Sequence, residues 1–195
     1  MTAGDEHAAA AAGTTSAGLV LAAGAGRRFG GPKQLALLDG RPLVEHALAA
    51  LAGLDRVVVV LGARADEVRG GADLGAAEVV VCDGWADGMS ASLRAGLAAL
   101  RGADEVVIVL ADQPFIGAAV MERVRAAPGA AARAVYGGEP GHPVVVRAPL
   151  LERAGELRGD AGFRDLLGAA VEVECSDLAD PTDIDTRDDL EVVRR

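Results

Sequence analysis

The stretch that decides the fold runs from Leu19 to Leu35 and reads LVLAAGAGRRFGGPKQL. An apolar run leads into a loop rich in glycine, and this loop carries two arginines, a proline and a lysine. A loop of this kind after a strand directs backbone N–H groups at an anion, and its glycines let the backbone approach a ligand closely. The stretch therefore predicts an α/β protein with a phosphate-binding loop.

The loop does not match the two best-known phosphate-binding motifs. A dinucleotide-binding loop has the form G-x-G-x-x-G and opens a helix directly, but residues 24–30 read GAGRRFG, with the third glycine one position late. Residues 30–32, Gly-Gly-Pro, block an immediate helix. Residues 62–64, Gly-Ala-Arg, stand where an acidic residue is expected after the second strand. The Gly-Lys-Ser/Thr of a Walker A loop is also missing.

The loop also carries three cationic residues, Arg27, Arg28 and Lys33. One interpretation is a solvated basic patch. The other is a clamp on triphosphate oxygens, to which arginine donates forked hydrogen bonds and lysine offers a point charge. Such a clamp suits attack at a phosphorus atom, because it stabilises charge on the phosphoryl oxygens and on the leaving pyrophosphate.

The composition limits the kind of protein and the kind of partner. Of 195 residues, 51% are hydrophobic and only 3% are aromatic, so the core is aliphatic, as in a buried parallel sheet. The formal net charge of −10 argues against a nucleic-acid partner, because phosphate backbones bind basic surfaces. The two cysteines form no CxxC motif, and no apolar stretch is long enough to span a bilayer. We therefore expect a cytoplasmic protein that binds no membrane.

Apolar runs of strand length alternate with segments of helical spacing, which predicts right-handed βαβ units and a mostly parallel central sheet with helices on both faces. The predicted strands are 18–22, 56–61, 78–82, 105–110, 134–136, 144–146 and 171–174, with a turn at 137–141. The predicted helices are 43–51, 65–69, 90–100, 116–126 and 188–193. We expect residues 1–17 to form a disordered tail and residues 18–195 to form a single domain.

The loop sequence LAAGAGRRFGGPKQL resembles the signature loop of nucleotidyltransferases that build nucleoside-diphosphate sugars, CDP-methylerythritol and the dinucleotide forms of molybdopterin. Together with the motifs below, it is most similar to the MobA-like NTP transferase family, in its molybdenum cofactor cytidylyltransferase branch. The resemblance runs from residue 18 to the C-terminus. It implies a Rossmann-like nucleotidyltransferase (GT-A-like) fold and Mg²⁺-dependent transfer of CMP from CTP to the phosphate of molybdopterin, with release of pyrophosphate.

Acidic residues follow the predicted strand 105–110 and precede the last helix. Asp112, in the motif LADQP, stands at the carboxyl end of a parallel strand, where ligands bind in open α/β sheets. One carboxylate with phosphate oxygens and waters is a usual Mg²⁺ site, and the resemblance gives Asp112 this role; the alternative is a cap on the helix predicted from residue 116. The resemblance places a second ligand at Asp183 or, failing that, at Asp185. Asp185 or Thr186 is alternatively the N-cap of the last helix.

The resemblance also assigns the nucleotide site. Arg28 and Lys33 hold the CTP phosphates and, with Asp112, form the catalytic group. Residues 85–93, WADGMSASL, resemble the family element W-x-x-G-M-x-x-S-L, in which Trp85 either contacts the ligand or packs in the core. The residues that the resemblance assigns to nucleotide binding are Leu21, Ala22, Ala23, Gly24, Gly26, Lys33, Gly88 and Ser92.

The acceptor site rests on two further elements of the molybdenum-cofactor branch, Gly-His-Pro at 141–143 and GDAGFR at 159–164. They assign contacts with a pterin phosphate to His142, Asp160 and Arg164, although His142 is alternatively a structural turn residue. Phe163 departs from the small residue expected there, which leaves the acceptor open. The Leu-Ala-Ala-Gly form of residues 21–24 favours CTP over GTP by resemblance, because guanylyl-transferring relatives more often carry paired glycines there.

Three alternatives stay open at this point. The first is the same chemistry on another substrate, either guanylyl transfer from GTP or cytidylyl transfer to methylerythritol phosphate, since Pro32-Lys33-Gln34 resembles that family too. The second is an NAD(P)H-dependent oxidoreductase of MobA-like fold. The third is a non-catalytic chaperone that hands the cofactor to a molybdoenzyme; a molybdoenzyme is also the expected recipient of a transferase product.

Overall fold

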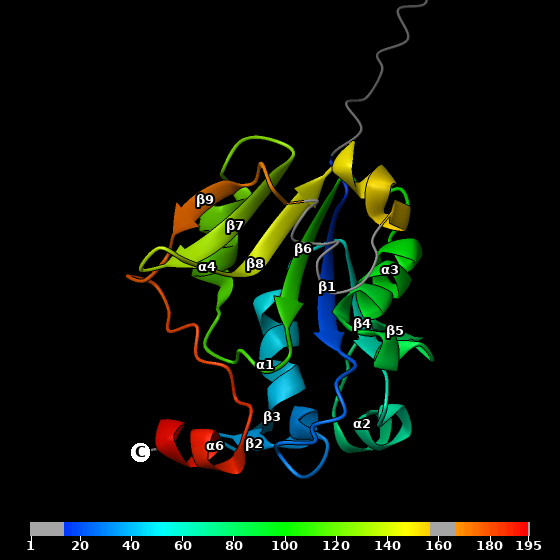
Figure 1. Ribbon diagram of the computed structural model, residues 1–195, viewed down its shortest axis with the longest axis vertical. Coiled ribbons are helices and arrows are strands. Elements are labelled where there is room, and N and C mark those ends of the chain that lie inside the picture. The colour runs from blue at the N-terminus through cyan, green and yellow to red at the C-terminus, as the bar shows by residue number, and fades with distance from the viewer. Residues whose placement is uncertain (1–13, 157–166, 195) are drawn as a thin grey trace, which may run out of the picture.

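The computed structural model describes residues 14–156 and 167–194, which build a seven-stranded sheet with helices on both sides (Figure 1). The strand order is β5-β4-β1-β6-β8-β7-β9, and only β8 runs against its neighbours. The strands are β1 (Ser16–Ala22), β4 (Arg56–Leu61), β5 (Glu78–Val81), β6 (Glu105–Leu110), β7 (Ala131–Tyr136), β8 (Glu139–Arg147) and β9 (Val171–Glu174), and β2 (Leu37–Leu38) pairs with β3 (Arg41–Pro42) in a separate ribbon. The helices are α1 (Leu43–Ala50), α2 (Ala65–Gly71), α3 (Met89–Ala99), α4 (Ala118–Arg125) and α6 (Arg187–Val193), with 3-10 turns η1 (Lys33–Leu35), η2 (Trp85–Asp87) and η3 (Leu150–Glu156).

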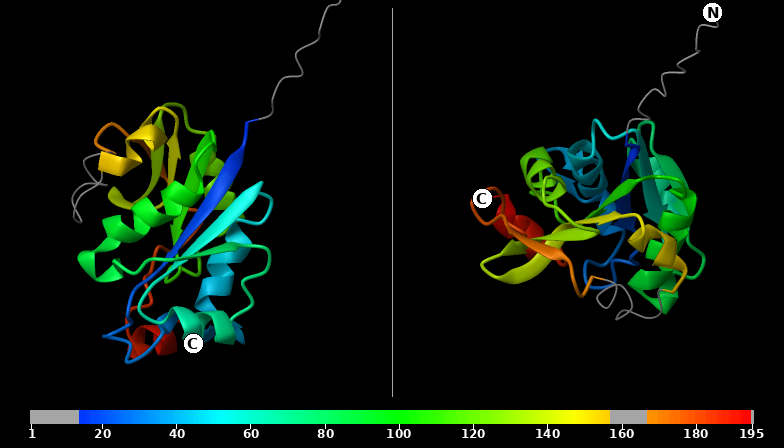
Figure 2. Two further views of the ribbon diagram at one scale, coloured as in Figure 1. Left: turned by 90° about the vertical axis from the view of Figure 1, so that its right-hand side faces the viewer. Right: turned by 90° about the horizontal axis from the view of Figure 1, so that it is seen from above.

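The two faces of the sheet follow from the alternation of side chains along each strand. In β1, Val20 and Ala22 face the core shared with α1 and α4, whereas Leu19 and Leu21 face α3. The left view of Figure 2 shows α1 and α3 on opposite sides of the sheet. Both faces of the central strands are buried, which explains why these strands read as continuous apolar runs.

A third, smaller core lies beyond the carboxyl ends of the parallel strands, near the bottom of Figure 1. It joins Phe29 from the loop after β1, Leu38 from β2 and Leu43 from α1 to Ile184 and Leu190 from the C-terminal segment. This core fixes the loop after β1 and the C-terminal segment beside the edge of the sheet where the predicted site lies. Within the described residues, no helix is long and apolar enough to cross a bilayer.

The predicted mostly parallel α/β fold is confirmed, but several predicted boundaries differ from the observed ones, and two of these differences have a clear local cause. Strand β1 begins at Ser16 rather than Gly18, because the Ser16 backbone N–H and hydroxyl both donate to Asp55 (2.8 and 3.1 Å) and the strand is paired on both sides. The predicted turn at 137–141 is only two residues long, Gly137-Gly138, with φ of 61° and 85°. Two consecutive residues with positive φ form the tight hairpin turn that matches strand twist, so β7 and β8 pair directly up to it.

Replacing Gly96 with alanine should destabilise the fold by about 1–3 kcal/mol, a typical cost of overpacking a core. Gly96 lies where α3 crosses the sheet, and an added Cβ would overlap Leu19 Cδ1 and come within 2.8 Å of Val60 Cγ2. Gly70→Ala in α2 is the matched control, since no atom lies within 4 Å of its added Cβ and alanine is the better helix former. Urea denaturation of both variants measures the difference, and equal stabilities would contradict the close packing.

Candidate active site

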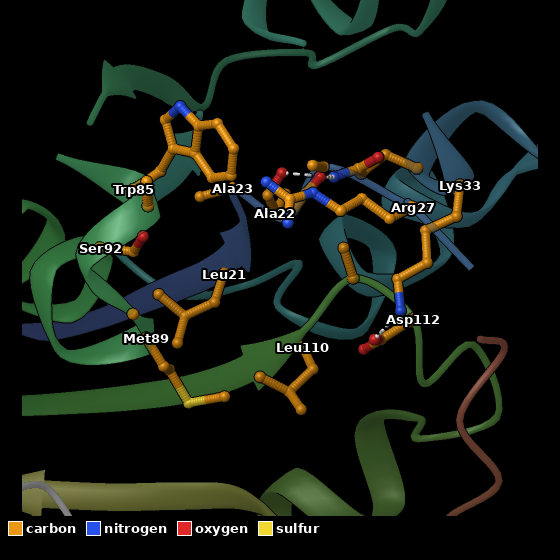
Figure 3. A pocket seen from close by; sticks show the side chains of 16 residues that line it. Leu21, Ala22, Ala23, Arg27, Lys33, Trp85, Met89, Ser92, Leu110 and Asp112 are labelled. Atoms are coloured by element: carbon orange, nitrogen blue, oxygen red, sulfur yellow. Dashed lines mark hydrogen bonds and ion pairs between the residues drawn. The ribbon is translucent and has the colours of Figure 1, made fainter. Parts of the chain in front are cut away.

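A cavity of about 390 Å³ opens at the carboxyl ends of β1 and β6 (Figure 3). The chain leaves β1 toward β4 on one side and returns to β6 on the other, so this is the switch point at which open α/β sheets bind ligands. The residues that line the cavity are Leu21, Ala22, Ala23, Gly24, Ala25, Arg27, Lys33, Gln34, Trp85, Ala86, Gly88, Met89, Ser92, Leu110, Ala111 and Asp112. All residues predicted for nucleotide binding except Gly26 are among them.

Gly26 sets the shape of the loop instead of lining the cavity. Its φ is +62°, and an added Cβ would overlap the carbonyl oxygen of Gly31. The Gly26 carbonyl in turn accepts hydrogen bonds from the N–H groups of Gly30 (2.9 Å) and Gly31 (3.2 Å). The loop thus folds back on itself before η1, in keeping with the predicted block to an immediate helix.

Gln34 anchors this loop to the end of β1, a role that the sequence analysis did not assign. The side chain is buried, and its Nε2 donates to the carbonyl oxygens of Ala22 (2.6 Å) and Gly24 (2.9 Å). These two bonds fix the backbone that forms one wall of the cavity. The only sequence signal was the position of Gln34 directly after Lys33 in the same motif.

Lys33 connects the loop to two carboxylates from distant parts of the chain. Its Nζ lies 2.5 Å from Asp112 Oδ2 and 2.7 Å from Asp185 Oδ1 (the Asp112 contact is drawn in Figure 3). Burial alone would lower the pKa of Lys33, but the charge of Asp112 and the hydrogen bonds that Lys33 donates to both carboxylates outweigh it and raise the pKa. Lys33 therefore keeps its positive charge at one end of the cavity.

The two arginines of the loop differ in position. Arg27 lines the cavity. Arg28, predicted to hold phosphate, lies outside the lining, with 74% of its side chain exposed, and its Nη2 pairs with Asp185 Oδ2 at 2.9 Å. Adjacent residues of a loop point in different directions, and the sequence did not show which of the two faces the ligand.

The segment before α6 brings Asp183 and Asp185 to the site. Ile184 between them is fully buried, and its N–H donates to the backbone oxygen of Asp112 at 2.9 Å. Thr186 is the N-cap of α6 and forms a capping box with Asp189, which leaves the Asp185 side chain for Lys33 and Arg28. Loss of solvent around the carboxyl and the negative charge of Asp112 raise the pKa of Asp183, against a hydrogen bond from Gln113.

The sequence left one structural alternative for Asp112, a cap on the helix predicted from residue 116, and the structure excludes it. Helix α4 begins at Ala118 with Gly117 as its N-cap and no side-chain capping bond. Asp112 therefore does not cap this helix, and its carboxylate points instead to Lys33 (Figure 3).

The carboxylates suit a hard divalent cation by their chemistry. Asp112 and Asp185 already share one positively charged group, and burial together with the charge of Asp112 raises the pKa of Asp183. Carboxylate oxygens, completed by phosphate oxygens and waters, are ligands that Mg²⁺ and Mn²⁺ prefer. Among the residues that the structure describes, no three acidic, histidine or cysteine side chains form a ready-made metal cage, so phosphate oxygens would have to complete the site.

The far wall of the cavity comes from η2 and the first turns of α3. Trp85 is half-buried, lines the cavity and also packs against the core beneath α3, so its packing does not exclude a contact with a ligand. Ser92 is buried on the same helix, and Gly88, with φ of 103°, is the N-cap residue that lets the chain turn into α3. Figure 3 shows Trp85 and Lys33 at opposite ends of the cavity.

His142 lies in β8 close enough to Asp112 to feel its charge. Its ring Nε2 is buried and has no hydrogen-bond partner within residues 14–156 and 167–194, while its backbone oxygen accepts a hydrogen bond from the Tyr136 hydroxyl at 2.8 Å. Burial lowers the pKa of His142 to about 4, although the Asp112 charge raises it. The other two residues predicted to bind the acceptor, Asp160 and Arg164, lie outside the described residues.

The pKa of His142 predicts a specific loss of stability in acid. The folded value of about 4 lies below the ordinary value of 6.5, so the unfolded chain binds the proton first and the free energy of unfolding falls as the pH drops from 6.5 toward 4. The His142→Gln variant should lack this component. Thermal midpoints of both proteins at pH 7.5, 6 and 5 measure it, and a constant difference between them over this range would contradict the burial of a neutral imidazole.

The sequence profile of the MobA-like NTP transferase domain matches residues 18–174. The chain belongs to the MobA-like NTP transferase family. It is a nucleotidyltransferase by family, and relatives with that activity match it: the 2-C-methyl-D-erythritol 4-phosphate cytidylyltransferase of Cereibacter sphaeroides is 37% identical over 150 residues, 67% of this chain and 65% of the relative. The chain thus spans slightly less than two thirds of that enzyme's length.

One further relative and one solved structure are similar to this chain over most of its length. The nicotine blue oxidoreductase of Paenarthrobacter nicotinovorans is 37% identical over 186 residues, 87% of this chain and 91% of the relative. The crystal structure of Rv0371c from Mycobacterium tuberculosis in complex with manganese has a TM-score of 0.76 and 29% identity over 92% of this chain and 98% of that one. A solved structure similar to this chain is therefore that of a protein in complex with a divalent cation.

Proposed function

We propose that this MobA-like protein transfers CMP from CTP to the phosphate of molybdopterin, with release of pyrophosphate. The observation that carries the proposal is the meeting of Lys33, Asp112 and Asp185 at one end of a nucleotide-sized cavity at the switch point of the sheet. A cation from the glycine-rich loop and carboxylates from two other segments are the groups that phosphoryl transfer requires.

Positive charge for the triphosphate would come from the loop. Lys33 and Arg27 face the cavity, where Lys33 supplies a point charge and Arg27 a fork of donors for phosphate oxygens. Arg28 pairs with Asp185 at the rim, and in this proposal it holds that carboxylate in place and contributes charge at longer range. Together they would stabilise the leaving pyrophosphate.

Asp112 and Asp185, with Asp183 beside them, would hold the divalent cation, Mg²⁺ in this proposal. When bound, such a cation neutralises charge on the α-phosphate and on the acceptor phosphate. The chain's own contribution is to orient the carboxylates, which the ion pairs with Lys33 and the hydrogen bond from Ile184 N–H to the backbone oxygen of Asp112 support.

The reaction itself needs no covalent enzyme intermediate. An oxygen of the acceptor phosphate attacks the α-phosphorus in line, a new P–O bond forms, and the bond to the β-phosphate oxygen breaks with its electron pair going to pyrophosphate. Positioning and charge stabilisation supply the catalysis. Lys33 and Arg27 hold the β- and γ-phosphates while the bond breaks.

The choice of a pyrimidine is supported by the tight packing behind Ala23. An added Cβ at Gly62 would lie 2.5 Å from the Ala23 oxygen, 2.9 Å from the Ala23 Cβ and 2.7 Å from the Trp85 Cβ. The backbone behind Ala23 is therefore closely packed, and in this proposal the Ala23 side chain limits the room for the base. The relative from Cereibacter sphaeroides, a cytidylyltransferase by name, agrees with CTP as the donor.

A pterin phosphate as the acceptor is supported by the Gly-His-Pro motif at 141–143 and by the position of His142. His142 lies near Asp112, with its ring neutral and a buried nitrogen, and a neutral imidazole can donate or accept a hydrogen bond from a pterin or its phosphate. In this proposal Asp160 and Arg164 complete the acceptor site. The expected recipient of the product is a molybdoenzyme.

Pyrophosphate release tests donor, acceptor and metal together. The protein is incubated with Mg²⁺ or Mn²⁺, with CTP, GTP, ATP or UTP in turn, and with molybdopterin, with methylerythritol phosphate or without an acceptor. Release with CTP that requires both molybdopterin and the cation is the expected result. Release with methylerythritol phosphate as acceptor, or with GTP, would replace the acceptor or the base while leaving the reaction class, and no release in any combination would overturn the proposal.

A second candidate is an oxidoreductase, favoured by the name of the relative from Paenarthrobacter nicotinovorans. The loop at residues 24–30 lacks the dinucleotide fingerprint, which counts against a nicotinamide cofactor bound in the usual way. Oxidation of NADH or NADPH in the presence of nicotine blue, followed by absorbance, tests it. Turnover there without any pyrophosphate release would favour this candidate over nucleotidyl transfer.

A further inference from the structure

We propose that Lys33 is an internal counter-cation that a divalent metal ion replaces between Asp112 and Asp185, so that the lysine is released to the nucleotide phosphates only as the metal binds. The inference rests on the proposed function, because it takes this carboxylate pair as the metal-binding pair. It adds that phosphate capture and metal binding are two halves of one exchange of cations.

The carboxylate oxygens are already engaged by protein cations. Lys33 Nζ lies 2.5 Å from Asp112 Oδ2 and 2.7 Å from Asp185 Oδ1, and Arg28 takes the remaining oxygen of Asp185 at 2.9 Å. A divalent ion on the same oxygens would lie within a few ångströms of the Lys33 ammonium. Like charges at that distance repel strongly where water is partly excluded, and only 16% of the Lys33 side chain is exposed.

The residue type at this position suits an exchange. Lys33 is the only lysine among the 195 residues, all other Lys and Arg positions being arginines. An ammonium on a flexible four-carbon stem can turn from one set of oxygens to another, whereas a guanidinium is a rigid fork that binds in one plane. The cavity that Lys33 lines provides the second set of partners within reach of its stem.

The exchange predicts that Lys33 competes with the metal when no nucleotide is present. Removing the ammonium should therefore strengthen metal binding, although Lys33 is itself a substrate-binding residue in the proposed reaction. A residue that only held phosphate, or only stabilised the fold, would not produce this gain. The affinity for the metal alone is thus a readout distinct from activity.

Titration with Mn²⁺ followed by electron paramagnetic resonance measures this affinity in wild type, Lys33→Met and Arg27→Met, all without nucleotide. We expect Lys33→Met to bind Mn²⁺ at least about tenfold more tightly than wild type. The repulsion between the ammonium and a metal ion at contact distance corresponds to more than about a tenfold change in affinity at the effective dielectric of a protein. Arg27→Met removes the same charge from the exposed rim of the same cavity, where solvent screens it, and should change the affinity by about threefold or less. Equal affinities in wild type and Lys33→Met, or an equal gain in Arg27→Met, would overturn the proposal.

A second measurement on the wild-type protein avoids any question of folding in the variants. Because the chain has one lysine, protein labelled with [ε-¹³C]lysine gives a single ε-methylene signal. Saturation with Mg²⁺ alone should move this signal in the direction in which Asp112→Asn moves it without metal, since both release the ammonium from Asp112. A signal that stays in place while Mg²⁺ saturates the protein would overturn the exchange.

The outcomes separate this inference from the proposed function. If no nucleotide yields pyrophosphate but Lys33→Met binds Mn²⁺ more tightly, the reaction is wrong and the exchange holds. If CTP and molybdopterin yield pyrophosphate but the metal affinities do not change, the reaction holds and the exchange is wrong.

Discussion

Replacing Asp112 with asparagine is expected to lower the rate of pyrophosphate release at least about 100-fold, the usual cost of losing one group that stabilises transition-state charge. The substitution keeps the size of the side chain and the backbone oxygen that receives the Ile184 N–H. It removes the negative charge that faces Lys33 and that would share the divalent cation. The thermal midpoint should therefore change far less than the rate.

Asp188→Asn is the matched control for this variant. Asp188 lies in the first turn of α6, where it is exposed, and the change removes one negative charge near the same segment. Its rate should stay within about twofold of wild type, because exposed charges are largely screened. Asp112→Asn with the full rate, measured with CTP and molybdopterin at saturating Mg²⁺, would refute the assignment of Asp112 to catalysis.

Replacing Gly26 with alanine should weaken nucleotide binding about 100-fold or more while the sheet remains folded. A φ of +62° already costs an alanine about 1 kcal/mol or more. The alanine Cβ would also overlap the Gly31 carbonyl oxygen and lie 3.2 Å from the backbone nitrogen of Lys33. Because backbone atoms cannot rotate away, the loop must open and carry Lys33 with it. Isothermal titration with a non-hydrolysable CTP analogue measures the loss.

Alanine variants of two neighbouring glycines separate the effect of backbone strain from the effect of atomic overlap. Gly30 has φ of +82° with no atom within 4 Å of an added Cβ, and Gly31 has the same open space without a positive φ. Gly30→Ala should lose an intermediate amount of affinity through strain alone, and Gly31→Ala should lose little. Equal losses in all three variants would show that the loop needs flexibility rather than the particular shape described above.

The sheet was largely predictable because its central strands are short valine-rich runs. Residues 56–61, 105–110 and 171–174 were predicted with the bounds that the structure has. The hairpin of β7 and β8 was predicted too short, because Pro140 and the glycines around it resemble a loop in the sequence, whereas pairing across the sheet keeps Glu139–Arg147 extended. The ribbon of β2 and β3 has two residues in each strand, too few to leave a periodic pattern.

The site was predictable where position along a strand determines it. Asp112 follows β6 and Lys33 follows the loop after β1, and the carboxyl ends of adjacent parallel strands meet at one edge. The distinction between Arg27 and Arg28, and between Asp183 and Asp185, was not predictable. Each pair consists of similar residues on one irregular segment, and only contacts with other segments determine which of the two faces the cavity or Lys33.

The contact between Ile184 N–H and Asp112 O shows that the sheet and the site come from separate parts of the sequence. The family match ends at residue 174, and all seven strands of the sheet lie within residues 16–174. Asp183, Asp185 and the Ile184 and Leu190 side chains of the third core follow that match. A chain cut after residue 174 would retain the sequence of the whole sheet but leave Lys33 without one of its two carboxylates. The segment after residue 174 is therefore dispensable for the strands and necessary for the charge arrangement around Lys33.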